Sequence, residues 1–179
     1  MSAPSAKSSA LRMRTRPRPS DRRALRRLVE STGVFYREEI EIAIELLEER
    51  LRRGAKSGYE FIFAERAGEL VGYCVWGAVP LTKGSYDLYW IAVAPEAQGL
   101  GIGRRLMHLA ELAVAKLGGG RLYIETSSRD AYVRTRRFYL AAGYSRAARL
   151  RDFYARGDHK VVFCKVIAPA ARSRRRANT

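Results

Sequence analysis

The sequence predicts an α+β domain in which one mixed sheet is flanked by helices. Two helical patterns come first, three strand-like runs follow at short intervals, and the second half alternates strand, helix, strand, helix and strand. At 179 residues and 47% hydrophobic content, the chain is long enough for one domain with a substantial core. A doubly wound parallel sheet is not predicted, because the run of strand–helix–strand units that it needs is missing.

Two helices are predicted in the first third of the chain. Residues 21–32 follow Ser20, a residue type that often caps a helix N-terminus. Residues 37–54 place apolar side chains at helical spacing and end at a glycine. The apolar positions are Leu25, Leu28 and Val29 on the first helix, and Ile40, Ile44, Leu47 and Leu51 on the second. Each set shares one face, so both helices are expected to be amphipathic.

Three strands are predicted next. Residues 59–66 and 70–80 are rich in aromatic and β-branched residues, and the short segment AGE joins them as a hairpin. Residues 85–95 give a third strand, and Pro95 ends it because proline cannot continue the ladder.

The second half of the chain predicts alternating helices and strands. An amphipathic helix is expected over residues 104–120, where glycines stop it, and a strand follows over 121–127. Residues 130–144 indicate a short helix that ends at Gly143, and residues 160–167 a final strand. The apolar stripe expected on the first of these helices is Ile102, Leu106, Leu109, Ala113 and Leu117.

The segment QGLGIGRR, residues 98–105, lies between the third strand and this helix. Glycines accept positive φ and let a ligand approach the backbone, while N–H groups at a helix N-terminus bind anions. Arg104 and Arg105 could add charge-assisted contacts to phosphate oxygens. The arrangement fits a pyrophosphate site, and a plain tight turn is the alternative.

Two other phosphate-binding motifs are excluded. A P-loop needs Gly-Lys before Ser or Thr, and the chain has no Gly-Lys pair. A dinucleotide-binding fingerprint needs a glycine three positions after Gly101, where this chain has Arg104.

Two spaced motifs resemble the signatures of the GNAT superfamily of N-acetyltransferases. The first is IAVAPEAQGLGIGRRLM, in which Gln98, Gly101 and Gly103 match the acyl-CoA motif Q/R-x-x-G-x-G/A. The second is TRRFYLAAGY, residues 135–144. The resemblance extends from residue 11 to residue 167. It implies the GNAT fold, a mostly antiparallel mixed sheet flanked by helices, whose strands 88–93 and 121–126 splay apart.

The resemblance also implies a function and a set of cofactor contacts. The expected activity is transfer of the acetyl group of acetyl-CoA to a primary amine, by direct attack in a ternary complex. The alternative is a non-catalytic acyl-CoA-binding module that acts as a sensor or binds a partner. At position 132 many members have Asn, whereas this chain has Tyr. The implied cofactor contacts are Ile91, Ala92, Val93, Gln98, Gly99, Leu100, Gly101, Ile102, Gly103, Arg104 and Tyr132.

Three residues are candidates for the chemistry. Tyr139 matches the family's tyrosine that donates a proton to the sulfur, and its alternative role is core packing. Glu125 matches the general base of ribosomal-protein acetyltransferases, and Asp87 lies where histone-type members keep a glutamate. An ordered-water relay without a single base is also left open.

The acceptor is expected between two segments, residues 32–39 and 150–160. Their aromatic and acidic residues could form a pocket for a small-molecule or peptide amine. These residues are Phe35, Tyr36, Phe153 and Tyr154, together with Glu38, Glu39 and Asp152.

The net charge of +16 is concentrated at the ends of the chain. Residues 1–27 hold nine bases and one acid, residues 165–179 five bases and no acid, and the rest is near balance. Disordered basic tails are therefore expected at residues 1–10 and 169–179 around a domain at 11–168. Such tails would bind nucleic acid only weakly and without specificity.

Cysteine and histidine usage gives no site. Cys74 and Cys164 are expected in the core, and neither histidine has a partner at metal-ligand spacing, so no metal is predicted. The sequence shows no secretory signal and no membrane-spanning run, which favours a cytoplasmic monomer or homodimer without a membrane partner.

Overall fold

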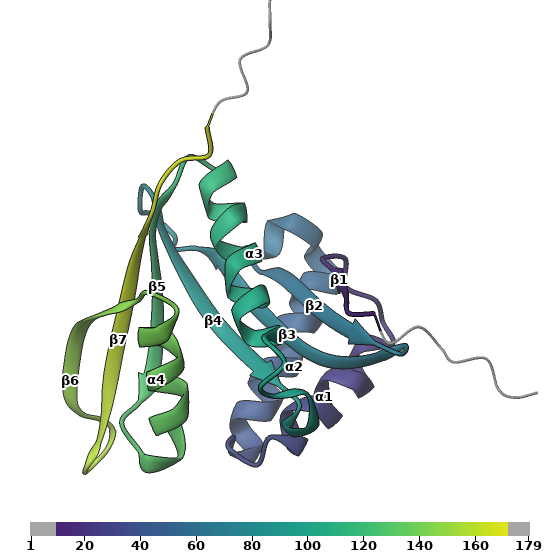
Figure 1. Cartoon of the computed structure of the whole chain (residues 1–179), viewed down its shortest axis with the longest axis horizontal. Coiled ribbons are helices and arrows are strands. Elements are labelled where there is room, and N and C mark those ends of the chain that lie inside the picture. Colours follow the sequence, from purple (N-terminus) through teal and green to yellow (C-terminus); the bar gives the residue numbers. More distant parts are fainter. Residues whose placement is uncertain (1–9, 172–179) are drawn as a thin grey trace, which may run out of the picture.

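The computed structural model describes residues 10–171, which form an open seven-stranded sheet with four α-helices around it (Figure 1). The predicted tails lie outside the described residues, apart from residue 10 and residues 169–171. The strands are β1 (Arg12–Arg14), β2 (Glu60–Arg66), β3 (Glu69–Ala78), β4 (Ser85–Val93), β5 (Gly120–Ser127), β6 (Ser145–Ala155) and β7 (Asp158–Ile167). The helices are α1 (Asp21–Ser31), α2 (Arg37–Arg53), α3 (Ile102–Lys116) and α4 (Val133–Ala141).

The order of the strands in the sheet is β1-β2-β3-β4-β5-β7-β6. β4 and β5 run parallel and are connected through α3, and the other neighbouring strands of the described sheet are antiparallel. The predicted mixed, mostly antiparallel α+β sheet is therefore confirmed.

Helices cover both faces of the sheet. Figure 1 shows α3 and α4 in front of it and α1 and α2 behind. α3 lies close to β3 because Gly72 has no side chain: a Cβ there would be only 3.1 Å from Ile102 Cγ2 and 3.4 Å from Leu106 Cδ1. This close approach puts the first turns of α3 directly over the sheet.

The predicted apolar stripe of α3 is wrong in its second half. Leu117 is 63% exposed, and Leu109 and Ala113 are only partly buried. The buried face follows four-residue steps through small as well as large side chains, because the helix packs closely on the sheet. Its members are Ile102, Leu106, Met107, Ala110 and Val114.

Two further expectations need correction. The Ser20 side chain makes no capping hydrogen bond, and Ser20 itself has helical φ and ψ. The turn before α1 is closed instead by a hydrogen bond that Asp21 N–H donates to Arg18 C=O. No element is predicted between residues 144 and 160, whereas the structure has the edge strand β6 there, which forms a hairpin with β7. All residues of β6 are exposed, so no apolar alternation marks it in the sequence.

The two central strands separate after a short parallel contact, as predicted. β4 and β5 pair only from Ser85 to Asp87, opposite residues 121–123. Just beyond, Tyr89 is an extra residue in β4, because Trp90 pairs with Val75 while Leu88 pairs with Trp76. A bulge of this kind bends its strand and so turns β4 away from β5.

Part of the N-terminal positive charge is neutralised by ion pairs within the folded domain. The buried Arg14 guanidinium donates to both Asp21 oxygens at 2.8 and 2.9 Å and to Glu65 at 2.8 Å. Arg22 and Arg26 of α1 form ion pairs with glutamates of α2. No helix within residues 10–171 is long and apolar enough to cross a membrane.

Candidate active site

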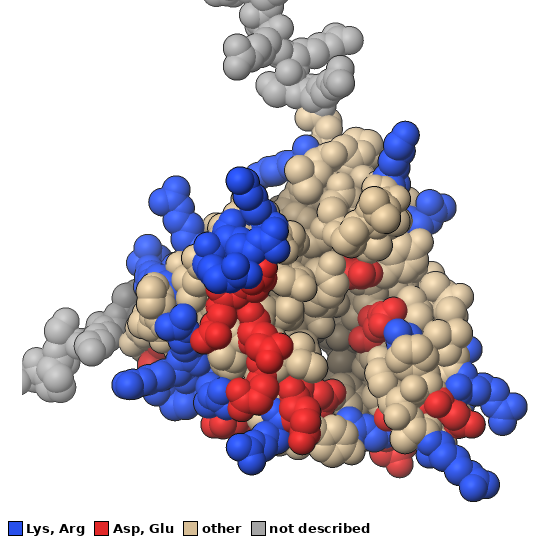
Figure 2. All heavy atoms as spheres, turned by 180° about the vertical axis from the view of Figure 1, so that it is seen from behind, with Lys and Arg blue, Asp and Glu red and all other residues tan. Residues whose placement is uncertain are grey.

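The split in the sheet opens into a cleft of about 540 Å³. One wall comes from residues 88–93 of β4 and the other from residues 124–127 of β5, with α4 at one side. Seen from behind, the molecule is hollowed between its helical half and the half that contains β5, β6 and β7 (Figure 2). A second cavity of about 570 Å³ shares residues 91–93 and continues along the glycine turn.

The bent end of β4 presents a free backbone edge to the cleft. Ala94 N–H donates to Val71 C=O at 2.9 Å, and hydrogen-bonded pairs alternate in an antiparallel ladder. Ala92 therefore directs its backbone groups toward β3, while Ile91 and Val93 direct theirs toward the gap left by β5. Of the three predicted contacts on this strand, Ile91 has both backbone groups on the open side, and Val93 has its N–H there while its C=O accepts from Gln98.

The glycines of the turn serve different purposes. Gly99 and Gly101 have φ of 80° and 76°, a backbone region that other residues enter at a cost, and Gly101 is the N-cap of α3. Gly103 lies inside the helix, where a Cβ would be 3.2 Å from the Phe138 ring. Gln98 Nε2 donates to Val93 C=O at 3.2 Å and ties the turn to the end of β4.

This turn and α4 together line the second cavity. The unpaired N–H groups of the first turn of α3 lie at its edge, which makes a suitable anion site. Leu100 is exposed and is not among the lining residues. The lining residues beyond β4 are Ala97, Gln98, Gly99, Gly101, Ile102, Gly103, Arg104, Arg134, Thr135 and Phe138.

Tyr139 lies in the wall of the cleft and is only 4% exposed. Its ring packs against Phe138 and Phe163, with 5.6 Å between centroids in both cases. Burial, reinforced by Tyr132, raises the Tyr139 pKa well above that of a free phenol. The hydroxyl therefore keeps its proton at neutral pH and can act as a donor.

The two predicted carboxylates lie near one another at the end of the cleft where the strands still pair. Asp87 is in the last paired position of β4, opposite Tyr123, and Glu125 is two residues further along β5 on the same face. Glu125 lines the cleft and Asp87 does not. Burial and the charge of Glu125 raise the Asp87 pKa, which Lys160 partly offsets.

Aromatic residues line the same cleft. Phe35 stacks on Trp90 with centroids 4.9 Å apart and meets the edge of Tyr132 at 6.5 Å. The Arg129 guanidinium lies 4.4 Å from the Tyr36 ring centroid and donates to the Tyr36 hydroxyl. Burial and the charge of Glu39 raise the pKa of Tyr132 to about 12. Tyr132 lines this cleft and not the cavity beside the glycine turn.

A family model described as an acetyltransferase (GNAT) domain matches residues 57–146, about half of the chain. This chain belongs to the GNAT acetyltransferase family. It is therefore an acyl-CoA-dependent N-acetyltransferase, and the resemblance seen in its two motifs is confirmed.

Solved structures of other GNAT proteins have the same fold. A GNAT-family protein from Desulfovibrio desulfuricans is 45% identical, with a TM-score of 0.87 over 89% of this chain and 100% of that one. The ribosomal-protein-S18-alanine N-acetyltransferase from Escherichia coli is 18% identical, with a TM-score of 0.70 over 92% and 98%. An aminoglycoside 6′-N-acetyltransferase complexed with coenzyme A is 20% identical, with a TM-score of 0.67 over 90% and 98%. The comparison with curated proteins gave no match.

Several residues around the cleft of this GNAT protein were not predicted. Arg134, Thr135 and Phe138 follow one another at helical spacing on α4, so the helical pattern could have placed them on one face. Trp90, Arg129 and Lys160 depend on the β4 bulge and on the pairing of β5 with β7, which the sequence does not reveal.

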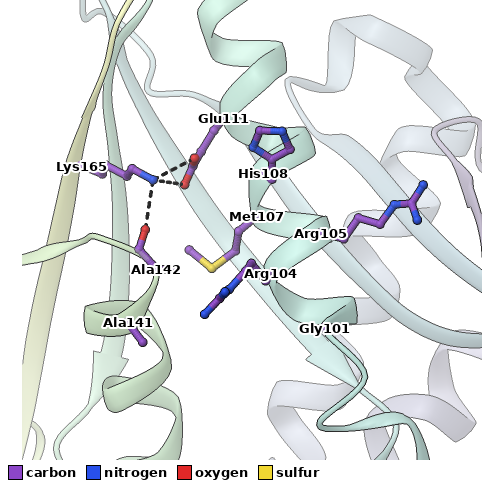
Figure 3. Close-up of a pocket in the computed structure, with 9 residues that line it drawn as sticks. All are labelled: Gly101, Arg104, Arg105, Met107, His108, Glu111, Ala141, Ala142 and Lys165. Atoms are coloured by element: carbon purple, nitrogen blue, oxygen red, sulfur yellow. Dashed lines mark hydrogen bonds and ion pairs between the residues drawn. The ribbon is translucent and has the colours of Figure 1, made fainter.

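A further pocket lies between α3 and α4. Lys165 Nζ bonds both Glu111 oxygens at 2.9 Å and Ala142 C=O at 3.0 Å (Figure 3). Figure 3 shows Arg104 pointing into the gap and Arg105 pointing away from it. Within residues 10–171, no three His, Cys, Asp or Glu side chains gather where they could hold a metal ion.

Proposed function

We propose that the chain transfers the acetyl group of acetyl-CoA to a primary amine by direct attack, with both substrates bound at once. The observation that carries this proposal is the arrangement around the split sheet. The free edge of β4, the buried phenol of Tyr139 and the carboxylate of Glu125 all border one cleft. The related fold of an acetyltransferase complexed with coenzyme A supports the choice of cofactor.

The residues present fit the parts of acetyl-CoA. The backbone N–H and C=O of Ile91 would pair with the pantetheine amides as an added strand does, because Val93 C=O already accepts from Gln98. N–H groups from Gly99 to Arg104 would hold the pyrophosphate, and Arg104 and Arg134 would add charge on either side of it. The cofactor supplies an activated thioester.

The cleft residues supply the proton transfers. Glu125 takes the proton that the amine loses, directly or through a water, while the new N–C bond forms. Tyr139 donates a proton to the sulfur as the C–S bond breaks, since its hydroxyl borders the cleft and is protonated at neutral pH. The N–H of Val93 would polarise the carbonyl, since it faces the cleft.

The aromatic lining of the cleft suits an ammonium group on an apolar body. The stacked Phe35 and Trp90 and the half-exposed Tyr154 offer aromatic faces, and Glu39 adds a carboxylate. This supports a small-molecule or peptide amine as the acceptor. The two free cysteines of the described chain agree with a reducing setting, and we place the reaction in the cytoplasm.

The test is release of the CoA thiol from acetyl-CoA in the presence of amines, peptides and polyamines. Replacing Tyr139 by Phe should lower kcat about 100-fold with little change in the KM for acetyl-CoA. Tyr144→Phe is the matched control, since Tyr144 is equally buried but does not line the cleft. Equal kcat values for the two variants would remove Tyr139 from the mechanism.

A further inference from the structure

Lys160 of β7 is held at the carboxylate end of the cleft. Its Nζ lies 2.6 Å from Glu125 Oε2, with the lysine side chain 13% exposed and the glutamate 52% exposed. The same Nζ lies 3.8 Å from the centroid of the Phe153 ring on β6. The cation is thus fixed by two strands of the half of the sheet that carries Glu125.

The ion pair restrains the Glu125 side chain. Lys160 Nζ contacts Oε2 of a glutamate that is about half exposed and lines the cleft. A carboxylate held by a fixed cation samples fewer orientations, so the ion pair keeps Glu125 at the cleft wall.

Lys160 also acts on the second carboxylate. Glu125 raises the pKa of Asp87 and Lys160 lowers it, so the three groups form one charge cluster. Tyr89 of β4 and Tyr154 of β6 face the same cluster, and their pKa values are raised by burial and by these carboxylates. Without the cation, burial and the charge of Glu125 would raise the Asp87 pKa further.

We propose that Lys160 is a positioning residue of the acetyl transfer: it holds Glu125 at the wall of the cleft in which the acceptor amine would bind. The proposal rests on the proposed function, in which Glu125 takes the proton of the amine. No covalent bond to Lys160 is involved.

The experiment compares Lys160→Met, Lys160→Arg and Lys165→Met in pH profiles of kcat/KM for an acceptor that the wild type acetylates. Lys160→Met should lower kcat/KM about tenfold at neutral pH and move the acidic limb up by about half a pH unit. Lys160→Arg should restore most of both, because the charge returns. Lys165→Met removes an ion-paired lysine from the same strand, at the pocket in Figure 3, and should not move the limb.

The outcomes separate this inference from the proposed function. An unmoved acidic limb in Lys160→Met, with Glu125→Gln strongly impaired, would overturn the role of Lys160 and leave Glu125 as the base. Equal shifts in Lys160→Met and Lys165→Met would also overturn it, since a general structural effect would explain both. A wild type that releases no CoA thiol with any amine would instead contradict the proposed function.

Discussion

Thr126 is a polar residue in an unfavourable place. Its side chain is buried in the cleft wall with 6% exposure, and its Oγ1 finds no hydrogen-bond partner within residues 10–171. A buried hydroxyl without a partner costs about 1–3 kcal/mol. Trp90 Nε1, on the facing strand β4, is also buried without a hydrogen-bond partner within residues 10–171. Two unpaired polar atoms in one cleft indicate that the site is not built for stability alone.

Replacing Thr126 by Val should therefore raise the free energy of unfolding by about 1 kcal/mol, because a methyl group takes the place of the unpaired hydroxyl. Urea unfolding measures this change. Thr32→Val is the control, since the Thr32 hydroxyl donates to Val29 C=O at 2.7 Å and its loss should be destabilising. A fall in stability in Thr126→Val would mean that the hydroxyl has a partner in solution.

Individual site residues were predictable where a motif fixes them. Gln98, Gly101 and Tyr139 come from the match to the two family motifs, and the structure places all three beside the cleft or the turn. Lys160 was not predictable, because its contact with Glu125 depends on the register of β5 with β7 across 35 positions of the chain. In the sequence, Lys160 is simply the first residue of the predicted final strand, and nothing around it indicates a site.

At the scale of elements, the bulge in β4 and the glycine turn act together. The bulge frees the edge of β4, and the turn brings the N-terminus of α3 to the end of that edge. Positive φ at Gly101 is required for the chain to enter the helix at this point. A residue with a Cβ would cost about 1–2 kcal/mol there and would shift the N–H groups.

Gly101→Val should weaken acetyl-CoA binding at least tenfold, measured by calorimetry. Gly68→Val is a matched control, because Gly68 in the β2–β3 turn has φ of 86° and equally open surroundings, away from both cavities. Both variants should lose similar stability, and only the first should lose affinity. Unchanged affinity in Gly101→Val would show that the turn does not hold the cofactor.

Most elements were predictable because their side chains alternate or repeat with a clear period. β6 was missed for the opposite reason: every residue in it is exposed, it lies at the edge of the sheet, and two bulges interrupt its pairing. The buried face of α3 was partly mistaken, because it continues in four-residue steps through Ala110 and Val114, whereas the predicted stripe used Leu109, Ala113 and Leu117.

On the scale of the whole molecule, the charge is less one-sided than the composition implies. Arginines of α1 pair with Glu41 and Glu48 of α2, so this helical half shows acidic side chains as well as basic ones (Figure 2). Sequence counts could not reveal this, because the partners are 15 or more positions apart. Weak, salt-sensitive attraction to nucleic acid remains a prediction.

β4 and β5, the two central strands of the sheet, pair with each other only at one end. Three residue pairs join β4 to β5, and contacts of Phe35 with Tyr132 and of Tyr36 with Arg129 bridge the open part. The two halves of the molecule therefore share few contacts along the open part of the split, and a ligand bound between β4 and α4 adds contacts between them. Binding to the folded state alone raises the free energy of unfolding by about 2.7 kcal/mol at a hundredfold excess over Kd.

We therefore expect acetyl-CoA at this concentration to raise the Tm by about 5–10 °C, since 1 kcal/mol corresponds to about 2–4 °C for a chain of this size. Differential scanning calorimetry measures it, with Gly68→Val expected to keep the rise and Gly101→Val to lose most of it. The comparison matters because both substitutions place a Cβ at a positive φ, so a response lost in Gly101→Val alone reports on the site. A wild-type Tm that does not respond at concentrations saturating for thiol release would contradict binding between the two halves, because any ligand that prefers the folded chain must stabilise it.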